Sequence, residues 1–71
     1  MNVFVYRTDI DSEYDLEGID ELLSNHETII RWNVDREDVD KVLRIESTAD
    51  NAGELLDAVV RAGYFCEELQ D

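Results

Sequence analysis

"TIIRWNVD" (residues 28–35) and "DKVLRIEST" (residues 40–48) are the two segments that decide the fold of this chain. Both segments have the short, mixed apolar and polar composition that is typical of β-strands. The polar connection REDV (residues 36–39) is short, so we predict that the two segments pair as a hairpin. The connection has no clear two-residue turn signal, and the register of the hairpin stays open.

The sequence before this hairpin predicts one strand followed by one helix. Residues 2–10 alternate between two faces, and the face expected to be buried consists of Phe4, Tyr6, Thr8 and Ile10. Apolar residues then recur at helical spacing, with acidic residues on the opposite side, at Leu16, Ile19, Leu22 and Leu23. Asn25 and His26 end this helix, where a histidine charge would favour the negative end of the helix dipole.

The sequence after the hairpin predicts a second helix and a short last strand. The helix begins near Ala52, and its apolar stripe consists of Leu55, Leu56, Val59 and Val60. Asn51, with Glu54 three residues later, is expected to cap its start. Gly63 fits the left-handed position that closes a helix. The last strand is YFCEEL (residues 64–69).

The order of these elements is strand, helix, strand, strand, helix, strand. It predicts an α+β protein, a ferredoxin-like βαββαβ sandwich whose four-stranded antiparallel sheet carries two helices on one face. Residues 1–71 are expected to form a single domain, because no linker, repeat or low-complexity tract interrupts them. No signal peptide or transmembrane segment is recognisable, so a cytoplasmic location is expected.

The charge of the chain is its most unusual compositional feature. Nineteen acidic residues face six basic ones, which gives a formal net charge of −13. Such a surface repels nucleic acids and anionic membranes, and neither is an expected partner. At molar salt the repulsion is screened within about 3 Å, so we interpret the composition as halophilic adaptation. The alternative is an acidic domain that meets a basic partner.

Within the predicted fold, the chain resembles the heavy-metal-associated domain of copper chaperones and metal-transporting ATPases. The segment WNVDREDVDKVLRIE (residues 32–46) is similar to the central hairpin of this family. The segment LLDAVVRAGYFCEEL (residues 55–69) is similar to its second helix and closing Gly-Tyr strand. The resemblance implies that the strands at 28–35, 40–48 and 2–10 lie side by side in that order. It also implies that Cys66 faces the core as an inert thiol.

The metal-binding motif of the family, Met-x-Cys-x-x-Cys, lies between its first strand and first helix. Matching the Leu22-Leu23 pair to the helix positions of the family puts Ile10 at the methionine and Ser12 and Asp15 at the two cysteines. A serine hydroxyl and a lone carboxylate do not replace the two thiolates that hold copper(I). The resemblance therefore implies a degenerate metal site, and no cofactor is expected.

The same stretch, TDIDSEYD (residues 8–15), has two further interpretations. Ser12 and Asp15 match a variant capping box, which predicts a charged helix start. The alternate acids from Asp9 to Asp15 also fit the register of a calcium loop, but Tyr14 stands where such a loop requires glycine. Weak cation binding is left as the minor alternative, with candidate ligands Asp11, Ser12, Asp15 and Tyr64, the last because the resemblance places it near this loop.

Three arginines form a second candidate site. If the apolar positions of the strands face the helices, then Arg7, Arg31 and Arg44 all project from the open face of the sheet. One interpretation is a set of cross-strand ion pairs with Glu46 and neighbouring acids. The other is a docking face for an acidic protein partner or for a second copy of the domain.

The sequence offers no residues for enzymatic chemistry. No serine or cysteine is placed to pair with His26, no base is evident beside Cys66, and no cofactor-binding loop is found. We therefore expect a small non-catalytic binding or adaptor domain that has lost the thiolate metal site. The alternative is a metal-binding accessory protein that retains weak cation binding through Asp11, Asp15 and Tyr64.

Overall fold

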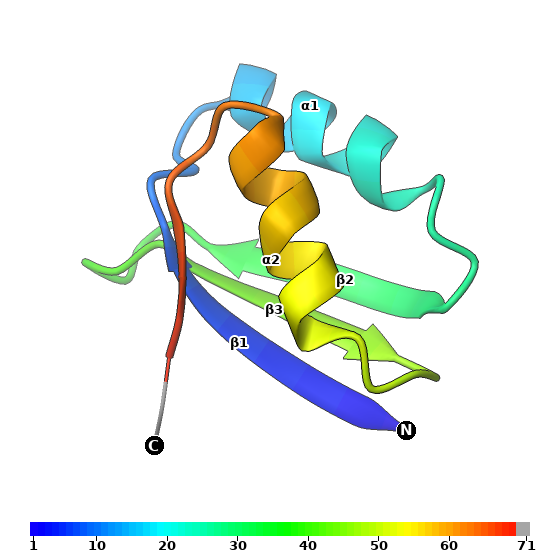
Figure 1. Ribbon diagram of the computed structural model, residues 1–71. Coiled ribbons are helices and arrows are strands. Elements are labelled where there is room, and N and C mark those ends of the chain that lie inside the picture. The colour runs from blue at the N-terminus through cyan, green and yellow to red at the C-terminus, as the bar shows by residue number, and fades with distance from the viewer. Residues whose placement is uncertain (70–71) are drawn as a thin grey trace.

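Two helices lie on the same side of a sheet, in two layers (Figure 1). The structure, a computed structural model, describes residues 1–69. Its elements are, in order, β1 (Asn2–Thr8), α1 (Glu13–Leu23), β2 (Ile29–Asp35), β3 (Val42–Ser47), α2 (Ala52–Arg61) and β4 (Cys66–Glu68). The predicted ferredoxin-like α+β sandwich is confirmed. Neither helix of the described part is long and apolar enough to cross a membrane.

The four strands are arranged in the order β2-β3-β1-β4, and every neighbouring pair is antiparallel. The structure also supplies the register of the hairpin, in which Arg31 lies opposite Glu46 and Asn33 opposite Arg44. A register shift between Ile29 and Arg31 leaves Ile30 as the extra residue of a bulge. The bulge keeps the apolar residues on both sides of it facing the helices.

The core lies between the sheet and the two helices. Its fully buried apolar residues come from both strands and helices: Tyr6, Ile10, Ile19, Leu23, Leu43, Ile45, Leu55 and Val59. Each such side chain contributes about 1.5–3 kcal/mol by leaving water. The strand residues among them alternate with outward-facing residues, which is why the period-2 pattern of the sequence predicted this face correctly.

The strands are shorter than the sequence pattern suggested, because hydrogen bonds outside the ladder or an irregular backbone conformation occur at their ends. β1 ends at Thr8, whose N–H donates to the carbonyl oxygen of Asp40 at 3.0 Å. β3 begins at Val42, because Lys41 adopts a φ of 45°. β4 begins only at Cys66, since the N–H of Phe65 donates to Oδ1 of Asp9 at 3.1 Å instead of joining the ladder.

The first helix is capped as predicted. Oγ of Ser12 accepts from the N–H of Asp15 at 3.0 Å, and Oδ2 of Asp15 accepts from the N–H of Ser12 at 3.4 Å, which completes a capping box. At the end of the second helix, Gly63 has a φ of 101°, as predicted for the residue that closes α2.

The predicted cap of the second helix is wrong. The side chain of Asn51 makes no capping hydrogen bond to α2. Its Oδ1 instead accepts from Oγ of Ser47 at 3.0 Å, and its Nδ2 donates to Oγ1 of Thr28 at 3.0 Å. Ser47 is fully buried, and a buried hydroxyl without a partner is costly, so this tertiary contact takes the amide away from the helix.

Candidate functional site

The loop between β1 and α1, residues 9–12, is where the metal motif of the resembled family would lie. Here the carboxylate of Asp15 is occupied by backbone groups, because the N–H groups of Asp11 and Ser12 donate to it at 3.3 and 3.4 Å. These two hydrogen bonds hold the pKa of Asp15 below its usual value. The backbone of the loop therefore binds the carboxylate of Asp15, which is part of the cap of α1.

Two basic residues of the β2–β3 connection, Arg36 and Lys41, clamp this loop from outside. Nζ of Lys41 lies 3.3 Å from Oδ1 of Asp11. Arg36 donates to the carbonyl oxygen of Asp11 at 2.9 Å and pairs with Glu13 at 3.4 Å. Nζ of Lys41 also donates to the carbonyl oxygen of Arg36 at 2.6 Å, which ties the clamp together. Cations of the chain itself thus balance part of the acidic loop.

Sequence reasoning missed this loop clamp, although a signal for it was present. In an antiparallel pair the start of one strand lies beside the end of the other. The implied pairing of residues 2–10 with residues 40–48 therefore brings the connection at 36–41 next to the loop at 9–12. Two of the six basic residues of the chain fall in that connection.

Tyr64 lies beside the same helix, but farther along it than expected. Its hydroxyl packs directly against Gly18 of α1, where a β-carbon would overlap it. Burial raises the pKa of Tyr64, and the negative charge of Asp15 adds to this effect. Tyr64 is thus close enough to the loop to sense its charge, while its hydroxyl covers the helix backbone.

Each of the four candidate cation ligands has another contact in the described residues. Among residues 1–69, no group of three or more His, Cys, Asp or Glu side chains is placed to hold a metal ion. Asp11 contacts Lys41, Ser12 and Asp15 contact each other, and Tyr64 contacts Gly18. Any cation binding at this loop would have to compete with these contacts.

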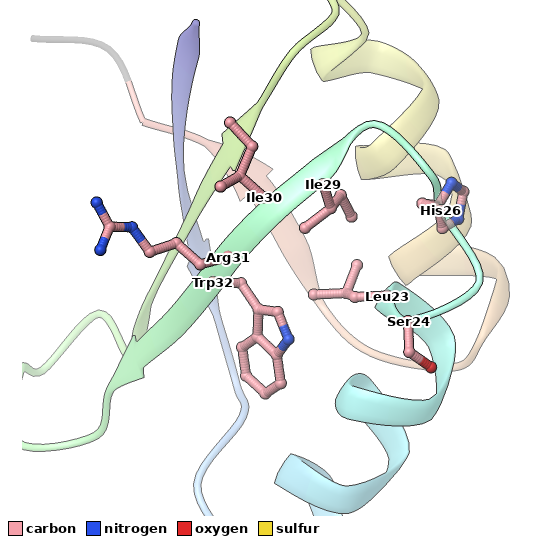
Figure 2. Close-up of a pocket in the computed structure, with 7 residues that line it drawn as sticks. All are labelled: Leu23, Ser24, His26, Ile29, Ile30, Arg31 and Trp32. Carbon is pink, nitrogen blue, oxygen red and sulfur yellow. The ribbon is translucent and has the colours of Figure 1, made fainter.

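The cysteine and the histidine of the chain, Cys66 and His26, contact residues that belong to the fold. Cys66 packs against the core, and burial raises the pKa of its thiol to about 11, so the thiol is protonated at neutral pH. His26 follows α1 and donates its N–H to the carbonyl oxygen of Leu23 at 3.1 Å. Its side chain lines a hollow that also includes Leu23 and Trp32 (Figure 2).

The face of the sheet that the helices leave uncovered, called the open face below, carries the three arginines. Its outward-facing residues on β1, β2 and β3 are Val3, Val5, Arg7, Arg31, Asn33, Asp35, Val42, Arg44 and Glu46. Figure 2 shows Arg31 pointing away from α1, on the side of β2 opposite to Trp32. The arginines predicted for this face therefore share it.

The three arginines differ in their partners. Arg31 forms an ion pair with Glu46 across the β2–β3 ladder. Arg7 lies 3.7 Å from Glu67 on β4 and stacks over the ring of Phe65, with its guanidinium carbon 5.7 Å from the ring centre. For Arg44, no acidic side chain within ion-pair distance is found among residues 1–69. The interpretation as cross-strand ion pairs thus holds for Arg7 and Arg31, whereas the guanidinium of Arg44 has no acidic partner among the described residues.

Arg44 stands near the middle of the open face. Its neighbours across the two adjacent strands are Asn33 on β2 and Val5 on β1, which carry no charge. Two shallow hollows share Asn33 and Arg44 in their linings. The charge of Arg44 is therefore exposed to solvent between two depressions.

Comparison with known proteins shows the fold of the chain. No family model matches it, and no curated protein matches it either. A solved structure described as "Crosstalk between Cu(I) and Zn(II) homeostasis" is 17% identical, covers 97% of this chain and 100% of its own, and has a TM-score of 0.80. The N-terminal domain of PacS from Synechocystis PCC6803 is 15% identical over 99% of this chain and 100% of its own, with a TM-score of 0.81.

A third similar structure is the N-terminal domain of ZntA in the Zn(II)-form. It is 13% identical over 96% of this chain and 92% of its own, with a TM-score of 0.79. This chain therefore shares the backbone fold of these three structures. At these identities the likeness concerns the backbone, and what the other proteins bind is a property of those proteins.

Proposed function

We propose that this chain is a small non-catalytic binding module that docks a partner protein on its open face and has lost the thiolate metal site. The observation that carries the proposal is Arg44, an exposed arginine in the middle of a sheet face and without an acidic partner in the described residues. Arginine is enriched at interface centres because its planar guanidinium binds a carboxylate through two hydrogen bonds.

The partner that fits this face presents a carboxylate surrounded by apolar groups. Val5 lies opposite Arg44, Val42 is two residues before it on the same side of β3, and Val3 is next along β1. Apolar contacts with these valines would exclude water around the ion pair and strengthen it. The Arg31–Glu46 and Arg7–Glu67 pairs lie to either side, where they would form a polar rim.

The contacts of the β1–α1 loop support an adaptor over a cation-binding protein. A divalent cation at Asp11 would have to displace the ammonium of Lys41, which lies 3.3 Å from the carboxylate. At Asp15 it would have to compete with two backbone donors. Hard cations are bound tightly only by several oxygen ligands with free lone pairs, so weak cation binding through Asp11, Asp15 and Tyr64 remains the alternative.

The experiment is a pull-down from native lysate at molar salt with the tagged wild type and the R7Q/R31Q/R44Q variant. We expect the triple variant to remain folded and to lose a partner that the wild type captures. The matched control is R61Q, which removes a positive charge from α2, where Arg61 pairs with Asp57 at 3.2 Å. The control should capture the partner as the wild type does. Capture by the triple variant would rule out the open face as the docking site.

A further inference from the structure

The two edges of the sheet are unequal. β4 forms one edge and has three residues, whereas β2 forms the other and has seven. Every second residue of an edge strand directs its N–H and C=O away from the sheet, so a long edge is a template for another strand. Among the described residues, no strand pairs with the outer side of β2. β2 is therefore the edge able to accept a further strand.

The charges of β2 are self-complementary about Asn33. Arg31 lies two residues before it and Asp35 two residues after it, and all three face the open side of the sheet. If two copies of β2 pair antiparallel with Asn33 on the two-fold axis, the Arg31 of each copy lies opposite the Asp35 of the other. Opposite charges placed directly across a ladder stabilise it.

The side chains of Arg31 and Asp35 both have hydrogen-bonding atoms left for this contact. The side chain of Arg31 remains 73% exposed although it pairs with Glu46. Asp35 uses Oδ1 to accept from the N–H of Glu37 at 3.1 Å, and its second oxygen makes no other hydrogen bond in the described residues. A guanidinium has five N–H donors, so Arg31 can contact one carboxylate within its chain and one across the axis.

The same register also matches the helix side of β2. There Trp32 of one copy lies opposite Val34 of the other, and both residues are only partly buried in the single chain. Beside Trp32 is the hollow lined by Leu23, His26 and Ile29, which opens near this edge (Figure 2). Pairing would cover the exposed part of the indole, and a large aromatic side chain buried at an interface contributes strongly to binding.

We propose that two copies of this chain associate through their β2 edges, antiparallel about Asn33, to form one continuous sheet across both. A second copy of the chain fits this edge, because β2 carries a positive and a negative side chain at equal distances on either side of Asn33. The inference does not rest on the proposed docking function. Arg44 is on β3 and faces the open side, away from the β2 edge.

The net charge of the chain makes this association dependent on salt. Each copy carries −13, so two copies repel each other over a Debye length of about 10 Å at 0.1 M salt. At about 2 M salt the long-range repulsion is screened, while contacts at the interface persist. The dimer is therefore expected to become more stable as the salt concentration rises, whereas an association driven only by exposed ion pairs would become weaker.

Charge reversal tests the register directly. In R31D each pair across the axis becomes two carboxylates, and in D35R it becomes two guanidiniums. Each variant alone should raise the dimer dissociation constant about tenfold or more at high salt. In an equimolar mixture, both pairs become complementary again, so a heterodimer with near-wild-type affinity should form. Sedimentation equilibrium of differently labelled proteins in about 2 M sodium chloride measures the dissociation constants of R31D alone, of D35R alone and of their mixture.

The matched control is R44D, which reverses an arginine charge on the neighbouring strand but off the edge. It should dimerise as the wild type does, even if it loses the partner of the open face, so the two proposals fail separately. Circular dichroism checks that every variant is folded. A wild type that is monomeric up to millimolar concentration at high salt would overturn the proposal. Folded R31D and D35R proteins that ignore each other when mixed would overturn the register and the proposal with it.

Discussion

The hydroxyl of Tyr64 lies directly against Gly18 and occupies the space that a β-carbon at this position of α1 would fill. The contact joins the segment after α2 to the middle of α1. It explains why a glycine is tolerated in the interior of an 11-residue helix, where it weakens the helix itself.

Replacing Gly18 with alanine should therefore destabilise the domain. In an exposed helix interior this substitution stabilises by about 1 kcal/mol, but here the new methyl group would overlap the Tyr64 hydroxyl. We expect a net loss of about 1–2 kcal/mol in urea unfolding, typical of overpacking. The G18A/Y64F variant should recover much of that loss, because it removes the overlapping oxygen. A G18A protein more stable than the wild type would contradict this packing.

The carboxylate of Asp15 should make stability depend on pH. Its pKa in the folded state is held below the unfolded value of 3.8 by the N–H groups of Asp11 and Ser12. The unfolded state therefore binds the proton more readily, so the contribution of Asp15 is present above pH 4 or so and is lost as the pH falls through the folded pKa. Comparing D15N with the wild type from about pH 6 to pH 2 measures it.

The expected result is a stability difference between the wild type and D15N that shrinks as the pH falls. D20N is a suitable control, since Asp20 is an exposed acid of the same helix and does not take part in the capping box. A constant difference between the wild type and D15N over the whole range would show that the capping carboxylate is not the titrating group.

The acidic surface should make the domain more stable in salt. Nineteen acids on one small domain repel one another, and the screening length falls from about 10 Å at 0.1 M to about 3 Å at 1 M. We expect the melting temperature to rise markedly between these concentrations of sodium chloride. Measuring at low protein concentration separates this effect from dimer formation. An unchanged melting temperature up to 2 M would end the interpretation as halophilic adaptation.

The β1–α1 loop should not retain copper(I). It offers the hydroxyl of Ser12 and the carboxylate of Asp15, and copper(I) selects soft sulfur ligands. We expect the wild type to lose copper(I) to a strong chelator and S12C/D15C to retain one equivalent. The single variant S12C, with one thiol in the loop, is the control and should also lose the metal. Retention by the wild type would refute the loss of the site, and loss by the double variant would refute its placement.

The sequence predicted those features that depend on local periodicity. Alternation along residues 2–10 and 40–48 placed Tyr6, Leu43 and Ile45 in the core, and the spacing of Ser12 and Asp15 predicted the capping box. These predictions succeeded because a strand or a helix start is decided by residues within a few positions of one another.

Features that depend on contacts between distant segments were missed. Asn51 has the sequence of a helix cap, but Ser47 and Thr28 take its amide, and no local pattern reveals that competition. The contact of Tyr64 with Gly18 depends on how the segment after α2 is positioned along α1, and the sequence does not specify that position. The clamp of Lys41 on Asp11 needs the pairing of β1 with β3, which a pattern read along a single strand does not contain.

The shortness of β4 has a consequence for how far association can proceed. Only three residues form this edge, and two of them, Glu67 and Glu68, are exposed acids that repel an approaching strand. When two β2 strands pair, the accessible edge of each copy is covered, so the proposed assembly is a closed dimer. Growth into filaments, the usual hazard of an open sheet at high protein concentration, would have to continue from the short and acidic β4 edge.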